Sequence, residues 1–321
     1  MSKLFNLEKL LIVFLLSTAL IFPVACAPSS PPASPDEEMP VMDKEPVITI
    51  YRTATGNTDS LNLEEYVKGV VAAEIGGKFP LEALKAQAVA ARTMSLVKIE
   101  YENGTHNEYK ADASDDHKNF QAYDESKITV EIARAVDETR GQALVYKGRY
   151  AYTLFHSYSK SKTASIEESF PGLAAKAENI KEYIVPVKAC GFDKAPDKYK
   201  NWQVQIAKSE FLNILGSPGG DLSGLTIKKR GPSGRALDIT TGNASISGAE
   251  LRQKIGPDIL YSTDITNISL QNDSVVIDGN GWGHGCGLEQ YGASVLAEQG
   301  QTARDILTHY YPNTKVHQVY K

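Results

Sequence analysis

The stretch NLEEYVKGVVAAEIGGKFPLEALKAQAVAARTMSLVKI, residues 62–99, predicts two consecutive helices. Asn62 with an acidic residue three positions later is typical of a helix start, and apolar residues then recur every three or four positions. The glycines at 76–77 end this helix, and Pro80 opens a second one that continues to about residue 99. In segments later in the chain, polar and apolar residues alternate as they do in antiparallel strands. We therefore expect an α+β fold in which N-terminal helices pack with mostly antiparallel strands around a substrate cleft.

The same patterns predict the remaining elements. Strands are expected at 47–51 and 274–277 and in two hairpins, 142–146 with 149–158 and 225–230 with 235–240. Helices are expected at about 129–137, 288–299 and 303–310, and Ser247 begins a short capped helix.

Composition excludes several classes of protein. Of 321 residues, 42% are apolar and 23% charged, as in ordinary globular domains, and the net charge is −5. An acidic chain without a basic block is not expected to bind nucleic acid. Three cysteines without a CxxC pattern exclude a zinc ribbon or an iron–sulfur cluster.

The N-terminus carries an export signal. Residues 10–25 are uncharged, which is short for a spanning helix and right for a secretory signal. Cys26 follows a small residue and resembles a lipoprotein processing site, with an uncleaved anchor or full secretion as alternatives. We predict a signal or anchor segment at 1–26, a Pro/Ser-rich tether at 27–46 and a folded domain at 47–321. Each alternative places that domain outside the cytoplasm, and lipidation of Cys26 would anchor it to the membrane.

Glu74 occupies an unusual place for a carboxylate. It continues the apolar stripe of the first predicted helix and lies in its last turn. Burial and the negative end of the helix dipole both raise the pKa of a carboxyl group there. A raised pKa suits a general acid for a glycosidic bond. The alternative is a glutamate that reaches solvent or pairs with a lysine.

Lys85 and Arg92 lie two turns apart on one face of the second predicted helix. They are either solvated charges or groups that line a cleft with Glu74 and bind an anionic substituent.

His284 lies among alternating glycines, which permit a close approach by a ligand or backbone. His156, with Ser157 and Ser159, is a weaker candidate of the same kind. Either histidine is catalytic or structural. Neither a nucleotide-binding glycine pattern nor a G-x-S-x-G nucleophile motif is present in the sequence.

Two long blocks, Val67–Glu74 and Phe79–Thr93, resemble the stage II sporulation protein D family, which includes the amidase enhancers. The resemblance extends over about 50–320. Its further blocks are Gln121–Tyr123, Thr139–Gly141, His156–Ser159, Ser233–Arg235, Ser247–Arg252, Gly281–Ala293 and His309–Pro312.

The resemblance implies a peptidoglycan lytic transglycosylase that acts on glycan strands stripped of stem peptides and leaves 1,6-anhydro ends. It places the catalytic acid on Glu74, implies no metal or cofactor, and suggests an amidase or engulfment proteins as partners in sporulation or wall remodelling. The implied substrate-binding residues are Lys85, Arg92, Gln121, His156, Ser157, Ser159, Arg235, His284, Gln290 and Tyr291.

The sequence departs from the family pattern in three places. The loop at 111–117 has no cysteine, so we expect no zinc. After His156 the chain reads Tyr-Ser-Lys-Ser at 158–161, where the family often has Ser-Ser-Gly-Gly. Cys286 and Cys190 are either a disulfide or two free thiols.

Two alternatives to the lytic transglycosylase remain at this stage. One is a non-catalytic wall-binding protein that enhances an amidase. The other, a hydrolase that uses water, needs a second carboxylate near Glu74. Glu64 and Glu65 are poor candidates for that role because they lie about 14 Å away along the helix.

Overall fold

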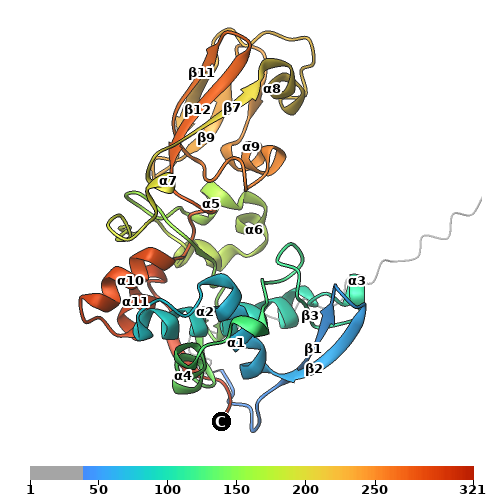
Figure 1. Ribbon diagram of the computed structural model, residues 1–321, viewed down its shortest axis with the longest axis vertical. Coiled ribbons are helices and arrows are strands. Elements are labelled where there is room, and N and C mark those ends of the chain that lie inside the picture. The colour runs from blue at the N-terminus through green and yellow to red at the C-terminus, as the bar shows by residue number, and fades with distance from the viewer. Residues whose placement is uncertain (1–38) are drawn as a thin grey trace, which may run out of the picture. The chain divides into compact units, whose positions relative to one another are not determined.

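Helices α1 (Leu63–Glu74) and α2 (Leu81–Glu102) form where the two apolar stripes predict them. The computed structural model describes residues 39–321 (Figure 1). Cys26 and the predicted signal segment lie outside this part of the chain, as does most of the predicted tether. Gly76, with a φ of 73°, follows α1 and ends it, as expected for a glycine after a helix.

The other helical elements are short. They are α3 (His106–Tyr109), η1 (Glu125–Lys127), α4 (Val130–Glu138), α5 (Ile166–Ser169), α6 (Pro171–Lys176), η2 (Glu178–Glu182), α7 (Asp197–Lys200), α8 (Lys208–Ile214), α9 (Gly248–Ile255), α10 (Gln290–Glu298) and α11 (Ala303–Tyr310).

The strands are also short. They are β1 (Val47–Arg52), β2 (Asn57–Asn62), β3 (Ala113–Ser114), β4 (Gln142–Tyr146), β5 (Arg149–Tyr150), β6 (Phe155–His156), β7 (Trp202–Ala207), β8 (Thr226–Arg230), β9 (Ala236–Thr240), β10 (Ser245–Ile246), β11 (Asp264–Gln271), β12 (Ser274–Asn280), β13 (Leu288–Glu289) and β14 (Lys315–Gln318).

The strands form small separate sheets, with the orders β2-β1-β3, β10-β9-β8, β11-β12-β7, β13-β6 and β14-β4-β5. Most neighbours are antiparallel, and β3 and β13 are the parallel exceptions. The predicted α+β fold is confirmed.

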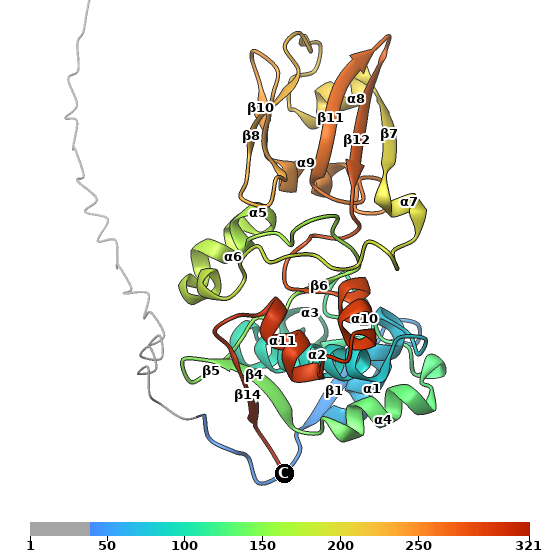
Figure 2. The same cartoon turned by 90° about the vertical axis from the view of Figure 1, so that its left-hand side faces the viewer.

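Helix α2 is the centre of a helical lobe, which we define as α1, α2, α4, α10 and α11 with the sheets around β1 and β4. It contacts α1, α4, α10, α11 and β4 (Figure 2). Many of its residues are alanines with no exposed surface, which lets neighbouring elements approach closely. The end of α1 and one face of α2 are thereby held in place.

A second group of elements, the strand lobe, comprises β7 to β12 with α8 and α9. Its own core includes Trp202, Phe211, Leu251 and Ile277, all buried. The chain between the lobes forms α5 and α6, which Figure 2 shows between the helical lobe and α9. Contacts join α5 to α9.

One predicted strand is wrong in its extent. The predicted strand 149–158 is two pieces, because Arg149–Tyr150 pairs with β4 whereas Phe155–His156 pairs in parallel with β13. Side-chain alternation does not reveal this change of partner. Near the start of the described chain, the N–H of Met42 donates to the Val319 carbonyl at 2.8 Å.

Seven strands have no counterpart in the sequence prediction, namely β2, β3, β7, β10, β11, β13 and β14. Charged or polar residues interrupt the apolar pattern of β2 and β11, which lie at sheet edges. In residues 39–321, no helix combines the length and apolar character that membrane crossing requires.

Candidate active site

Glu74 is the last residue of α1, and the residues before it on the stripe, such as Val67, Val70 and Val71, are fully buried. Its Oε1 accepts a hydrogen bond from the Ala122 N–H at 3.1 Å. Burial raises the pKa of Glu74, and the Ala122 N–H and His117 offset only part of this increase. The direction of the pKa shift expected from the sequence is confirmed.

Glu74 lines a cavity of about 600 Å³. Pockets of this size, largely apolar with a few polar groups, are typical of ligand sites. The lining residues come from α1, α2, the loop at 117–122, the segment before β6, α6 and the glycine-rich loop. They are Glu74, Met94, Lys98, Glu102, His117, Lys118, Phe120, Gln121, Ala122, Tyr152, Leu154, Phe155, Phe170, Leu173 and His284.

Gln121 stands in this cavity wall, as the predicted substrate-binding set requires. Its Nε2 donates to the Ser95 hydroxyl at 2.8 Å and to the Ala91 carbonyl at 3.4 Å. Its Oε1 has no hydrogen-bond partner within residues 39–321. The side chain is therefore fixed by α2 and keeps one acceptor unused.

The structure does not bring Lys85 and Arg92 to this cavity. Lys85 pairs with Glu82 at 2.8 Å and with Glu138 at 2.6 Å, on the side of α2 that packs against α4. The seven-residue spacing does place both cations on one face. The cavity, however, borders roughly the opposite face of α2, which carries Met94 and Lys98.

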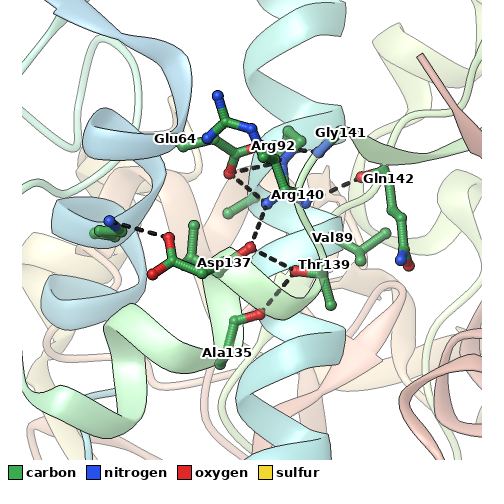
Figure 3. Close-up of polar contacts among 12 residues, drawn as sticks. Glu64, Val89, Arg92, Ala135, Asp137, Thr139, Arg140, Gly141 and Gln142 are labelled. Atoms are coloured by element: carbon green, nitrogen blue, oxygen red, sulfur yellow. Dashed lines mark hydrogen bonds and ion pairs between the residues drawn. The ribbon is translucent and has the colours of Figure 1, made fainter. Parts of the chain in front are cut away.

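Arg92 is fully buried and cannot touch a glycan, so its predicted role in substrate contact is wrong. Its Nη2 lies 2.5 Å from Glu64 Oε2, and its Nη1 donates to the Gln142 carbonyl at 3.0 Å (Figure 3). The same Glu64 carboxylate accepts from the Gly141 N–H at 2.9 Å and from the Tyr320 hydroxyl. Arg92 therefore joins α1 to α2, β4 and the C-terminus, and positions the helix that ends in Glu74.

His156 lies inside a chain of hydrogen bonds. Its Nδ1 faces the Cys286 carbonyl at 3.1 Å, so Nδ1 donates and Nε2 accepts from the Ser159 hydroxyl at 2.7 Å. The Arg235 Nη2 donates to the same hydroxyl oxygen at 2.9 Å. Burial, His284 and Arg235 lower the pKa of His156 well below its usual value. His156, Ser159 and Arg235 are buried, and none of them lines the cavity.

His284 is the residue of the glycine-rich loop that reaches the cavity. Its Nδ1 accepts from the Cys286 N–H at 3.1 Å, which leaves the ring proton on Nε2. Burial and the nearby Arg252 lower the pKa of His284 to about 3. The ring is therefore neutral and is not itself an acid at ordinary pH.

Ser157, Gln290 and Tyr291 form the connection between β6 and α10. The Tyr291 N–H donates to the Ser157 carbonyl at 3.2 Å, and Gln290 Nε2 donates to the backbone carbonyl of Glu74 at 3.3 Å. Gln290 thus contacts the backbone of Glu74 and not its carboxyl group. None of the three lines the cavity around the Glu74 side chain.

Sequence reasoning missed the residues of α2 and its following loop that do line the cavity, chiefly Lys98, Glu102, His117 and Lys118. Burial lowers the pKa of Lys98, whose Nζ lies 5.2 Å from the centre of the Phe120 ring. The four-residue spacing of Met94, Lys98 and Glu102 was a signal that could have found this face. Cys190 and Cys286 are both free thiols in the structure.

The region that contains α1 and α2 matches a known protein family. Residues 51–146 match the family described as Stage II sporulation protein. The stage II sporulation protein D of Bacillus subtilis (strain 168) is 32% identical over 310 residues, covering 90% of this chain and 84% of that protein. The protein of the same name in Bacillus amyloliquefaciens is 31% identical over 292 residues, covering 86% and 80%.

The amidase enhancer of Bacillus subtilis (strain 168) is 28% identical over 293 residues, covering 77% of this chain but 40% of that longer protein. The family match includes α1, which ends in Glu74, together with α2 and β4. The chain therefore belongs to the stage II sporulation protein D and amidase enhancer family.

Proposed function

We propose that this protein is a peptidoglycan lytic transglycosylase that cleaves the bond between N-acetylmuramic acid and N-acetylglucosamine. The observation that carries the proposal is Glu74, a carboxyl group with a raised pKa in the wall of a cavity of about 600 Å³. A protonated carboxyl group at neutral pH is what donation to a glycosidic oxygen requires.

The reaction needs one acid and base. Protonated Glu74 donates its proton to the glycosidic oxygen as the bond breaks, through a transition state that resembles an oxocarbenium ion. The carboxylate so formed keeps the hydrogen bond from Ala122. It then removes the proton of the muramyl C6 hydroxyl, whose oxygen attacks C1 and closes the 1,6-anhydro ring.

The cavity wall suits a sugar chain. Phe120, Tyr152, Phe155 and Phe170 supply apolar ring surface, and the Gln121 side chain, His117 and Lys118 add polar groups to the wall. Sugars present both apolar faces and hydroxyl groups, so a wall with few polar groups among aromatic side chains fixes their orientation.

The test is digestion of glycan strands freed of stem peptides, with products resolved by mass spectrometry. We expect anhydro ends from the wild type and a loss of at least about 10²-fold in rate for Glu74→Gln. Glu65→Gln is the matched control, because Glu65 is an exposed residue of the same helix that pairs with Lys68. Unaltered cleavage by Glu74→Gln would refute the assignment.

Glu102 gives a second candidate function a specific basis. It lines the same cavity as Glu74 and is therefore a candidate for the second carboxylate that a hydrolase requires. Products with a reducing end and an added water, abolished by Glu102→Gln, would identify an inverting or retaining hydrolase. Anhydro products that persist in Glu102→Gln would exclude it.

The non-catalytic alternative, a wall-binding protein that enhances an amidase, predicts a different result. Wild-type and Glu74→Gln proteins would both sediment with intact strands, cleave nothing and stimulate an amidase equally. An amidase also fits the leading proposal, because its removal of stem peptides produces the stripped strands that this protein would cleave.

We propose further that the protein acts outside the cytoplasm, tethered to the membrane by a lipid on Cys26. The basis is the sequence of the N-terminal segment. Metabolic labelling with a radioactive fatty acid should mark the wild type and leave Cys26→Ala unlabelled and released from the membrane. Labelling of neither protein, with both retained in the membrane, would favour an uncleaved anchor.

A further inference from the structure

A second cavity, of about 630 Å³, lies between α6 and α9. Its wall is formed by the chain at 169–173, one side of α9, and three residues from neighbouring loops, Pro257, Thr263 and His284. Phe170, Leu173 and His284 also line the cavity of Glu74. The two cavities are therefore neighbours that share this part of their walls.

Arg252 is the charged group of this second cavity that has no ionic partner. Its Nε donates to the carbonyls of Leu260 at 3.1 Å and Tyr261 at 3.3 Å. Across residues 39–321, no carboxylate lies within ion-pair distance of its guanidinium, and its two terminal nitrogens make no hydrogen bond to the protein. Two donors of a half-buried cation are thus free to bind a ligand in the cavity.

The surroundings of Arg252 favour an added negative charge. Burial lowers the pKa of Arg252 to about 10, and Arg235 adds to this, whereas Asp258 opposes it. Ser247 and Ala249, at the N-terminus of α9, line the same wall, so the positive end of the helix dipole adds to the charge of Arg252. Glu250 also lines it, but this carboxylate pairs with Lys254 at 3.0 Å.

The chemistry of the site selects a carboxylate. A guanidinium presents two parallel N–H donors that match the two oxygens of a carboxylate. The wall carries one arginine, Arg252, and one carboxylate, Glu250. This charge balance suits a ligand with a single negative charge better than a phosphate group with two. In a peptidoglycan strand, the sugar that can supply a carboxylate is the muramyl residue, through its lactyl group.

We infer that the cavity at Arg252 binds the free lactyl carboxylate of a muramyl residue in the same strand that Glu74 cleaves. This inference rests on the proposed function. A stem peptide converts the lactyl carboxylate into an amide and removes its charge. Arg252 is then a specificity-determining residue, which makes binding depend on the absence of the stem peptide.

The test measures binding, not cleavage, so that its failure is distinct from failure of the proposed function. The full-length protein with Glu74→Gln is titrated with a stripped tetrasaccharide and with the same tetrasaccharide after its carboxylates are converted to methylamides. We expect the carboxylate form to bind roughly 10- to 100-fold more tightly, as expected for charged hydrogen bonds. Adding Arg252→Gln should abolish this difference.

Two further variants control for charge and folding. Lys228→Gln removes a positive charge from an exposed position of β8 and should keep the full preference, because Lys228 does not line the cavity. Arg252→Lys keeps the charge without the paired donors and should keep part of the preference. An unaltered preference in Arg252→Gln that folds like its parent would overturn the inference.

A third ligand, the tetrasaccharide with a dipeptide on each muramyl residue, separates the two sources of a carboxylate. We expect it to bind as weakly as the methylamide. Tighter, Arg252-dependent binding of the dipeptide form would assign the site to stem-peptide carboxylates and overturn the lactyl assignment. Wild-type protein that cleaves nothing, with the Arg252-dependent preference intact, would refute only the proposed function.

Discussion

Three buried or half-buried glutamates show how partners decide what a carboxyl group does. Glu64 is fixed by Arg92, and Glu74 has a single N–H donor. Glu289 has no exposed surface and accepts from the N–H groups of Ser159, Cys190 and Gly191 and from the Tyr310 hydroxyl. Of the three, only Glu74 has a carboxyl group that is both hard to ionise and open to a ligand.

Sequence alone could identify Glu74, because its position on the helical stripe is local. It could not identify Glu289, whose backbone N–H donors lie about 100 or more residues away along the chain. The same limit applies to Lys98 and His117. Their approach to Glu74 depends on how the loop at 117–122 folds over α1 and α2.

The first prediction concerns Glu289, whose pKa burial raises to about 7. Because the folded state binds this proton more tightly than the unfolded chain, its contribution to stability is complete below pH 4.5 and is lost as pH rises through 7. Between pH 5 and 8 the wild type should lose on the order of 2–3 kcal/mol through this group. Glu289→Gln should lack this pH-dependent part.

Urea unfolding of both proteins at pH 5 and pH 8 tests this, because the other titrating groups cancel in the comparison. Glu298→Gln, at an exposed carboxylate paired with Lys194, should behave like the wild type. Identical slopes of stability against pH in the wild type and Glu289→Gln would contradict the prediction.

At the scale of elements, different faces of α2 contact different parts of the protein. Lys85 and Arg92 face α1, α4 and β4, whereas Met94 and Lys98 face the cavity. The spacing of the residues correctly predicts which of them share a face. It does not tell which face is covered by another element, because that depends on elements 40 to 60 residues further along the chain. The assignment of Arg92 to the substrate failed for this reason.

The second prediction concerns the buried pair of Arg92 and Glu64. Arg92→Met leaves the Glu64 carboxylate buried without its cation, which should lower the free energy of unfolding by about 3–5 kcal/mol. The double variant Glu64→Gln/Arg92→Met should be less destabilised than the sum of the two single variants. Chemical denaturation of the four proteins gives this coupling.

Glycan assays separate a positioning role of Arg92 from a role in substrate contact. Below the unfolding temperature, the folded Arg92→Met protein should retain its KM, and its kcat should fall through the displacement of Glu74. A rise in KM with unaltered kcat and unaltered stability would contradict the positioning role.

At the scale of the whole described chain, the glycine-rich loop at 281–287 connects the strand lobe to the helical lobe. A Cβ at Gly285, where φ is 88°, would lie 2.6 Å from the Arg235 Nη2, so only glycine lets the loop pass this buried cation. The sequence identified the loop by its glycines. Its position depends on Arg235 and on the pair His156 and Ser159, which come from two other segments of the chain.

A second connection to the strand lobe is made by Glu168 of α5, which lies in the chain between the lobes. Its Oε1 accepts from the N–H and hydroxyl of Ser233, at 3.0 and 2.7 Å, in the turn between β8 and β9. Its Oε2 accepts from the Ser165 N–H at 2.8 Å and caps α5. Both cavities border the short helices that this residue holds, so the continuity of the proposed glycan cleft depends on it.

The third prediction is that Glu168→Ala loosens this connection without unfolding the helical lobe. Loss of three hydrogen bonds to a buried carboxylate, two from Ser233 and one from Ser165, should speed amide hydrogen exchange at 231–234 and in α5 by roughly 10- to 100-fold. Exchange in α2 should not change, because no contact of Glu168 reaches it. Glu167→Ala, at the exposed neighbouring position, is the control. Equal acceleration across both lobes would mean that they unfold as one unit, and no acceleration at 231–234 would mean that Glu168 does not hold them together.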